Sequence, residues 1–168
     1  MNVSGRSTVD APREAVFAAI CDPEALLEII PGCQEIHRVS ADEYRGRIAI
    51  RLPAMVGAWE TTVRLVETDP PAFGAFEGRV EGKVGTIAGR AAFNLSADDG
   101  QTAIEYEGTG LVSGPLARLD SRFVEGLARS LIDEGLERLG RRLAAVPEGA
   151  ARPGETGEAR RSDKESTR

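Results

Sequence analysis

The sequence has few of the side chains from which enzymes build active sites. Its 168 residues include one histidine, two cysteines and no group of carboxylates at a spacing that suits a metal ion. Cys21 and Cys33 do not form a Cys-x-x-Cys pair, and His37 would add only one ligand, whereas a structural zinc ion takes four. We therefore expect no metal site, no catalytic residues and two reduced, half-buried thiols.

Signals for secretion, membrane insertion and nucleic-acid binding are also missing. The N-terminal segment lacks the apolar core of a signal peptide, and no run approaches the roughly 20 apolar residues that span a bilayer. The formal net charge of −6 disfavours a nucleic-acid partner, because phosphate binding needs a basic face. Neither a phosphate-binding glycine loop nor a serine nucleophile elbow occurs. These features favour a cytoplasmic protein that binds its partner without transforming it.

Alternating apolar residues predict seven strands. The first lies at 3–9, and two short helices with proline near their starts follow within 10–30. Six further alternating runs extend from Cys33 to Gly110, and Asp98-Asp99-Gly100 marks a hairpin turn. Because the alternation leaves one side polar, it indicates an antiparallel sheet with one face in water.

A long amphipathic helix is predicted to close the folded part, opening at Pro115. Apolar residues, mostly leucine, recur at threes, fours and one five from Leu116 to Val146. A coiled coil would show the same stripe, but the apolar face of the sheet has no other cover, so we expect the helix to pack there. Residues 147–168 contain no aromatic residue and no Leu, Ile or Val. We expect a folded domain at 1–146 and a disordered polar tail at 147–168.

The order of strand, two short helices, six-stranded meander and long helix is that of the helix-grip fold. Short motifs strengthen the likeness: Asp10-Ala11-Pro12, Asp22-Pro23, Ile30-Pro31-Gly32-Cys33, the glycines Gly78, Gly82, Gly85 and Gly89, and Gly114-Pro115-Leu116-Ala117. With these motifs residues 2–145 resemble the START-like (SRPBCC) superfamily and, more narrowly, the CoxG-like family, which is named for the G subunit of carbon monoxide dehydrogenase. We thus expect an α+β fold in which a curved seven-stranded antiparallel sheet wraps round the C-terminal helix.

The resemblance implies a hydrophobic cavity between sheet and terminal helix that takes a small molecule of the lipid or quinone type, with no covalent cofactor. It also implies an accessory or recruitment role for a molybdenum hydroxylase of the carbon monoxide dehydrogenase type, with peripheral contact at the inner membrane face. The neutral, polar tail departs from this pattern, because a tether would be apolar or basic and amphipathic.

Two other functions are compatible with the same fold. Some members of the superfamily are enzymes, so a small polyketide cyclase- or hydratase-like activity is the alternative. It would need an inward acid or base, and the predicted inward faces hold Thr61, Tyr44 and Tyr106 but no carboxylate or histidine. A docking subunit with a filled core is the third possibility.

Large residues predicted to point inward form the candidate ligand-binding set: Tyr44, Ile48, Ile50, Met55, Trp59, Val63, Phe76, Phe93, Leu95, Tyr106, Phe123 and Leu127. For each of them, ordinary core packing competes with ligand contact. Small inward residues such as Gly46 and Gly108 either leave room for a ligand or let the sheet bend. The phenols of Tyr44 and Tyr106 are candidates for a hydrogen bond to a quinone carbonyl.

The segment 52–59, Leu-Pro-Ala-Met-Val-Gly-Ala-Trp, is the most apolar loop that the sequence predicts. Loops normally face water. This one is either a lip that touches a membrane or partner, or a cap in which Met55 and Val56 fold over the end of the core.

If the segment is a lip, replacing Met55 and Val56 with serine should weaken association with lipid vesicles and leave the domain folded. Co-sedimentation measures the first effect and thermal unfolding the second. Co-sedimentation equal to that of the unaltered protein would count against the lip.

Overall fold

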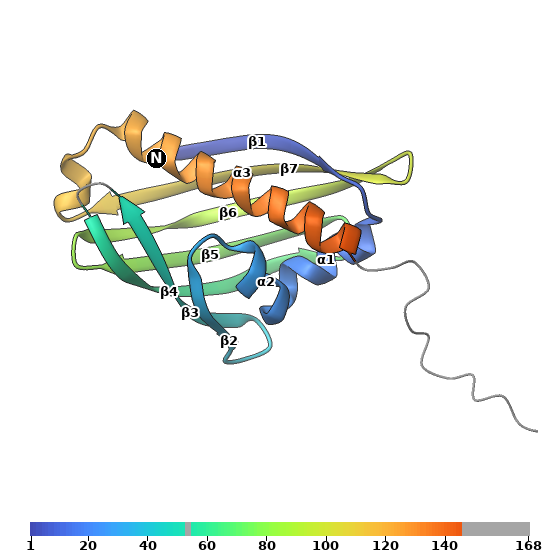
Figure 1. The fold of residues 1–168 in the computed structure, drawn as a ribbon, viewed down its shortest axis with the longest axis horizontal. Helices are drawn as coiled ribbons and strands as arrows, with labels where there is room; N and C mark the ends of the chain where they lie inside the picture. The colour runs from blue at the N-terminus through green and yellow to red at the C-terminus, as the bar shows by residue number, and fades with distance from the viewer. Residues whose placement is uncertain (53–54, 146–168) are drawn as a thin grey trace, which may run out of the picture.

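The computed structural model describes residues 1–52 and 55–145, which form one antiparallel sheet with helices on one side (Figure 1). The elements are β1 Asn2–Val9, α1 Arg13–Cys21, α2 Pro23–Ile29, β2 Cys33–Arg38, β3 Glu43–Leu52, β4 Met55–Asp69, β5 Phe73–Gly82, β6 Gly85–Asp98, β7 Gln101–Ser113, the 3-10 turn η1 Pro115–Arg118 and α3 Ser121–Ala145. The strand order is β1-β7-β6-β5-β4-β3-β2, so every pair but β1–β7 joins neighbours in sequence. The predicted α+β fold is confirmed, while the predicted tail at 147–168 lies outside the described residues.

The predicted turns and helix starts have the expected local chemistry. The Asp22 side chain accepts a hydrogen bond of 3.1 Å from the backbone N–H of Glu24, which caps α2 at its N-terminus. The β6–β7 hairpin turns through Asp99 at φ 55° and Gly100 at φ 83°. Two successive positive φ angles match the twist of the flanking strands, as in the favoured two-residue hairpin turns.

The terminal helix begins later than the predicted start at Pro115. Residues Pro115–Arg118 form the single turn η1, the backbone is extended at Leu119, and α3 starts at Ser121. The reason is tertiary: the N–H of Leu116 donates to the carbonyl of Val84 over 2.8 Å, and the Leu116 side chain is buried. The chain is therefore fixed to the β5–β6 turn before α3 begins.

The predicted apolar loop at 52–59 is mostly strand. β3 extends to Leu52 and β4 resumes at Met55, with Ala49 paired to Ala58 and Ile50 to Gly57. Antiparallel pairing satisfies the backbone groups that a loop would expose to water. The side chains at 52–56 lie outside the described residues.

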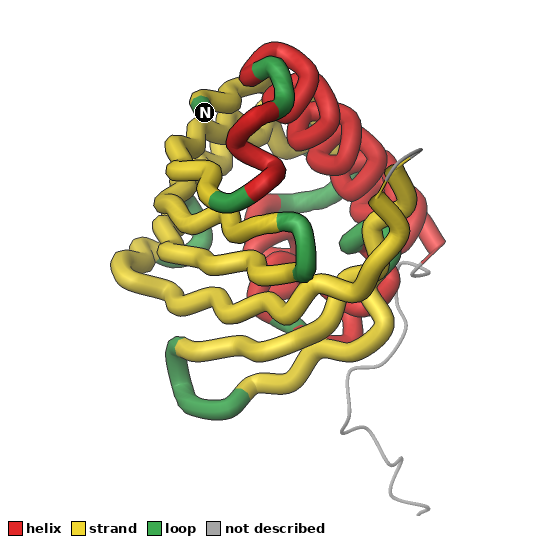
Figure 2. The backbone as a smooth tube through the Cα atoms, turned by 90° about the vertical axis from the view of Figure 1, so that its left-hand side faces the viewer, coloured by secondary structure: helices red, strands yellow, loops and turns green. Residues whose placement is uncertain are grey.

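The two faces of the sheet differ in polarity. The outer face carries cross-strand ion pairs such as Arg47–Glu60 at 3.0 Å and Arg64–Glu77 at 3.4 Å. Such exposed pairs contribute at most about 1 kcal/mol each. The inner face is apolar and bends round toward the side that carries the helices (Figure 2).

The buried core lies at one end of this inner face. It joins β1, α1, α2, β6, β7 and the C-terminal half of α3 through Val9, Ala11, Val16, Ala19, Ala25, Ile29, Phe93, Leu95, Ile104 and Leu139. The rings of Phe17 and Phe93 meet with centroids 5.9 Å apart. An ion pair between Arg142 and Glu28 links α3 to α2 at the same end.

Three inward aromatic rings lie against glycines on the neighbouring strand. Tyr106 lies over its register partner Gly5, where an added Cβ would be 2.5 Å from the phenol oxygen. Phe93 covers Gly74 in the same way, with 2.5 Å to the ring, and Trp59 covers Gly82, with 2.8 Å. The rings therefore lie along the sheet, and their bulk does not stand up into the space beneath the helix.

Replacing Gly74 with alanine should force the Phe93 ring out of the core and lower the free energy of unfolding by about 1–3 kcal/mol, as overpacking does. Urea denaturation measures the loss. Gly78 is the matched control on the same strand, because an added Cβ there meets no atom closer than 3.6 Å. Equal stability of the Gly74→Ala and Gly78→Ala variants would contradict the assigned packing.

Candidate functional site

The inner face of the sheet is incompletely covered beyond the core. Ile48, Val63, Val80 and Ile87 point to the side that carries the helices, yet each keeps part of its surface exposed. A sheet face sealed by a packed helix would bury such side chains. The space beneath the N-terminal half of α3 is therefore only partly filled.

A groove of about 480 Å³ lies beside this region, between α3 and the β2–β3 side of the sheet. Its lining comes from α3, from β3 and from the α2–β2 connection: Leu127, Leu131, Glu134, Arg138, Ala49, Ile50, Arg51, Pro31, Gly32, Cys33 and Gln34.

The α2–β2 connection turns toward the groove at a residue with a left-handed backbone conformation. Gly32 has φ 76°, its carbonyl accepts from the N–H of Ala49 over 2.8 Å, and a Cβ there would collide with the Ala49 carbonyl. Only glycine allows so close an approach at this dihedral angle. The turn is thus fixed against β3 and forms one wall of the groove.

The groove combines apolar walls with a charged rim. Ile50, Leu127 and Leu131 supply apolar surface, and the Arg138 guanidinium donates to the Glu134 carboxylate over 2.6 Å. Arg51 is exposed at the β3 side. Apolar pockets with a few polar groups at defined positions suit a ligand with an apolar body and a polar end.

The structure distributes the sequence-predicted ligand residues over several environments. Ile50 and Leu127 line the groove, and Ile48 and Val63 lie on the partly exposed inner face. Phe123 is 51 % exposed at the start of α3. The Met55 side chain lies outside the described residues.

The other predicted residues are packed within the protein. Phe93 and Leu95 belong to the core, Phe76 and Tyr106 pack against it, and Tyr44 and Trp59 are buried. Sequence reasoning missed Glu134, Arg138 and the Pro31–Gln34 turn as groove residues. The place of Leu131 in the apolar stripe of the helix could have indicated it as a groove residue. The Pro31–Gln34 turn could not be found in this way, because it contacts β3, which is distant in sequence.

The two tyrosines differ in the availability of their hydroxyl groups. The Tyr44 hydroxyl donates to the Cys21 carbonyl over 2.7 Å and accepts from Arg38 over 2.8 Å, so it holds the end of α1 against β3. The Tyr106 pKa is raised by burial and further by Asp133, with Arg129 acting against the shift. Tyr106 therefore keeps its proton at neutral pH and can act as a donor.

The remaining nucleophile candidates are poorly activated. Burial raises the pKa of the Cys21 thiol, with Arg38 partly opposing it, and burial also raises the pKa of Cys33. Both thiols are free and partly buried, as predicted, and a raised pKa leaves little reactive thiolate. His37, Asp98 and Asp99 are exposed. Within residues 1–52 and 55–145, no three His, Cys, Asp or Glu side chains cluster as metal ligands.

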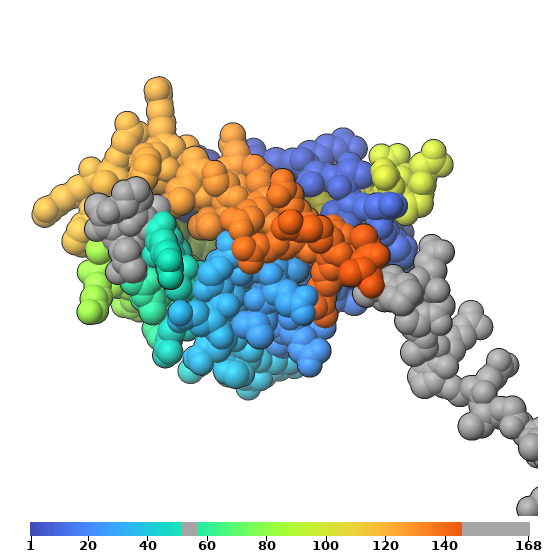
Figure 3. Space-filling view, viewed as in Figure 1, coloured from blue at the N-terminus to red at the C-terminus, as the bar shows by residue number. Residues whose placement is uncertain are grey.

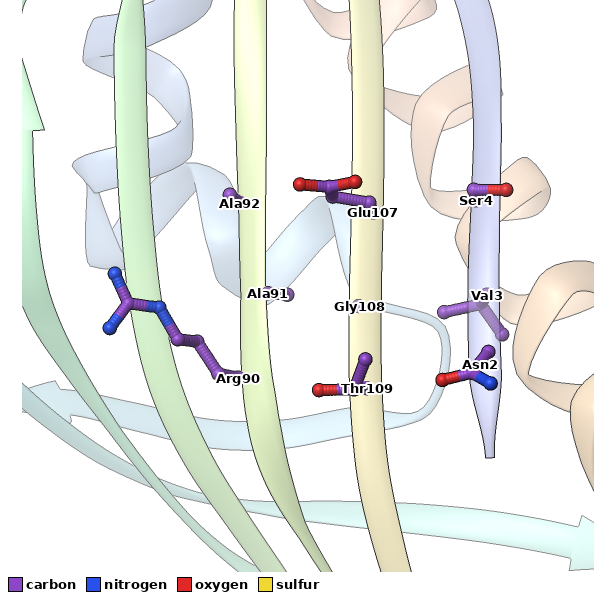
Figure 4. A pocket seen from close by; sticks show the side chains of 9 residues that line it. All are labelled: Asn2, Val3, Ser4, Arg90, Ala91, Ala92, Glu107, Gly108 and Thr109. Carbon is purple, nitrogen blue, oxygen red and sulfur yellow. The ribbon is translucent and has the colours of Figure 1, made fainter.

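Two further hollows, of about 440 and 660 Å³, lie on the outer face over β1, β5, β6 and β7. Figure 4 shows the first, with the helices behind the sheet. The polar side chains Arg90, Glu107 and Thr109 are exposed, and Arg90 pairs with Glu67 at 3.5 Å. Because these side chains are exposed and Arg90 is engaged with a residue outside the hollows, we regard the hollows as surface depressions and not as an organised site.

Solved structures place the chain in a known fold class. It is similar to a conserved protein from Geobacillus kaustophilus, with TM-score 0.81, 23% identity and coverage of 86% of this chain and 95% of that chain. It is also similar to a START superfamily protein from Mycobacterium smegmatis, with TM-score 0.66, 15% identity and coverage of 85% and 97%. A third similar structure is the di-domain ARO/CYC BexL from the BE-7585A biosynthetic pathway, with TM-score 0.65, 14% identity and coverage of 88% and 51%. The fold is START-like.

A family model narrows this class. The model for the G subunit of carbon monoxide dehydrogenase (CoxG) matches residues 5–144, and the chain belongs to that family. No curated protein sequence matches it significantly. Among the described helices, none has the length and apolar character needed to cross a bilayer.

The different bonding of the two tyrosines predicts different costs of losing a hydroxyl. Tyr44→Phe removes the buried bond to the Cys21 carbonyl and should cost about 1–2 kcal/mol of stability. Tyr106→Phe should change stability by less than about 0.5 kcal/mol. Urea unfolding of both variants checks the difference, and a larger loss for Tyr106→Phe would reverse the assignment.

Proposed function

We propose that this protein is a non-catalytic accessory subunit of a carbon monoxide dehydrogenase-type molybdenum hydroxylase and holds an apolar small molecule between its sheet and α3. The observation that carries the proposal is the partly exposed apolar inner face, beside which the groove at Leu127 and Leu131 lies. Membership of the CoxG family supports the partner enzyme.

Burial of apolar surface would drive uptake. A ligand that covers about 200 Å² of apolar surface gains roughly 5 kcal/mol before the costs of association are subtracted. An isoprenoid or acyl chain can provide such surface, which is the reason for proposing a lipid or quinone. The polar end of the molecule would remain near the charged rim formed by Arg51, Glu134 and Arg138.

Of the two tyrosines, Tyr106 is the remaining candidate to bind a ligand carbonyl. The Tyr44 hydroxyl is already engaged with the Cys21 carbonyl, and the Tyr106 ring lies on the inner face over Gly5. Peripheral contact with the inner membrane face is part of the same proposal, since a carrier of membrane-soluble molecules must meet the bilayer.

The enzymatic alternative receives no support from the groove. Glu134, the one carboxylate among the lining residues, is paired with Arg138. The likeness to BexL is one of fold at 14% identity. A cyclase or hydratase would need a free acid or base facing its substrate.

A side chain placed on the inner face should block uptake without unfolding the protein. Gly78 shares this face with Val63 and meets no atom within 3.6 Å, so Gly78→Leu should fold and project into the free space. A decyl-substituted benzoquinone and lauric acid serve as probes. Quenching of the single tryptophan, Trp59, and the rise in melting temperature report binding. We expect at least about tenfold weaker binding in Gly78→Leu.

Thr62→Leu is the matched control, because Thr62 lies on the exposed outer face of the neighbouring strand. It should bind both probes as the unaltered protein does. A filled interior would give the opposite pattern: no binding by the unaltered protein, and a loss of about 1–3 kcal/mol of stability in Gly78→Leu from overpacking. That result would leave the fold assignment intact and end the carrier proposal.

A further inference from the structure

Basic and apolar side chains gather at the end of the molecule where α3 begins. The β5–β6 turn and η1 are joined there by the hydrogen bond from Leu116 to Val84, and α3 starts three residues after η1. Figure 1 shows these segments at one end of the elongated fold, and Figure 3 shows side chains of this part of the chain projecting from it. We call the set Lys83, Arg118, Leu119, Arg122 and Phe123 the basic end.

The charges of the basic end are uncompensated. Lys83, Arg118 and Arg122 are exposed, and within the described part of the chain none of them forms an ion pair. Two acidic residues lie nearby in sequence. The Asp120 carboxylate accepts from the backbone N–H of Arg122 over 2.8 Å, and the Glu125 carboxylate accepts from that of Asn2 over 3.0 Å. In a chain of net charge −6, this end is therefore locally positive.

The apolar members are among the exposed large apolar residues of the protein. Phe123 is 51 % and Leu119 38 % exposed, and they are four positions apart with an arginine immediately before each. Such side chains cost free energy in water unless something covers them. Large apolar groups flanked by arginines are typical of segments that insert at the boundary between lipid headgroups and acyl chains.

We propose that the basic end docks on a membrane surface that contains anionic lipids, with Leu119 and Phe123 inserted and the three basic side chains among the headgroups. A stable protein–protein interface takes about 800 Å² from each partner, which a projecting end formed by short turns is poorly shaped to give. This inference deepens the proposed function: it rests on the membrane contact proposed there and assigns that contact to one surface, and docking can be measured without a ligand inside the fold.

The basic end lies next to the groove along α3, so docking would bring the groove close to the membrane. Leu127 and Leu131 lie one and two helical turns beyond Phe123 on α3, and both line the groove. A molecule that leaves the bilayer beside Phe123 would thus meet continuous apolar surface on its way inward.

Flotation of the purified full-length protein with vesicles tests the docking. Phosphatidylcholine vesicles with added phosphatidylglycerol should bind it, pure phosphatidylcholine vesicles should not, and raised salt should release it. Arg118→Gln with Arg122→Gln should weaken binding roughly 30-fold, at about 1 kcal/mol for each basic residue near an anionic surface. Phe123→Gln should also weaken binding, and Phe123→Trp should show a blue-shifted emission on vesicles beyond that of the buried Trp59.

Arg13→Gln with Arg141→Gln is the matched control. It removes the same charge from solvent-accessible residues, at the start of α1 and the C-terminal half of α3, and should leave vesicle binding unchanged. Equal losses in the two double variants, or no binding to anionic vesicles, would overturn the proposal. Binding to polyglutamate as tight as to vesicles, with no effect of Phe123→Gln, would assign the surface to an acidic protein instead. None of these outcomes depends on uptake of a quinone or fatty acid.

Discussion

The uneven attachment of α3 is the constraint on which the rest of the structure depends. Near its start Val124 is buried and Glu125 accepts from the backbone N–H of Asn2 in β1, whereas its C-terminal half joins the main core. Leu139 is 1 % exposed within the core that α1, α2, β6 and β7 also build, whereas Leu127 and Leu131, farther toward the N-terminus, keep part of their surface exposed. A fully buried leucine such as Leu139 contributes roughly 1.5–3 kcal/mol to this attachment. Because both short helices pack at the same end as Leu139, the inner face beneath the N-terminal half of α3 is only partly covered by the described residues.

The sheet also leaves this space open, because part of its inner face carries no side chains. Val63, Gly78, Gly89 and Gly110 stand in register across β4 to β7, so three successive strands present no side chain there. Glycine inside a strand is destabilising by about 0.5–1 kcal/mol relative to alanine. Aromatic rings cover the backbone at three other glycines of the sheet, Gly5, Gly74 and Gly82, and offset the cost at those positions. The row of Gly78, Gly89 and Gly110 has no such ring over it, so the inner face stays free of bulky side chains there.

The sequence predicted the architecture because its signals are local, whereas the candidate site depends on distant contacts. Strict alternation and the Asp99-Gly100 turn sufficed for the strands and their faces. The predicted start of the terminal helix was wrong, because the hydrogen bond from Leu116 to Val84 joins segments that no local sequence pattern connects. Phe93 and Ile50 were both predicted to point inward. Only the fold shows that Phe17 packs on Phe93, whereas Ile50 shares a groove with Leu127.

The distribution of charge fixes how an acidic chain can approach an anionic surface. On the outer face of the sheet, arginines such as Arg47 and Arg64 are paired with glutamates, and the net charge of the chain is −6. Potentials decay over about 8 Å at physiological ionic strength, so a charged surface responds mainly to the part of the protein nearest to it. An approach by the sheet or the C-terminal half of α3 gains little or is repelled. In the proposed docking, the end that carries Arg118 and Arg122 would be attracted and Phe123 would enter the apolar layer. That orientation would leave the outer face of the sheet free for the proposed partner enzyme.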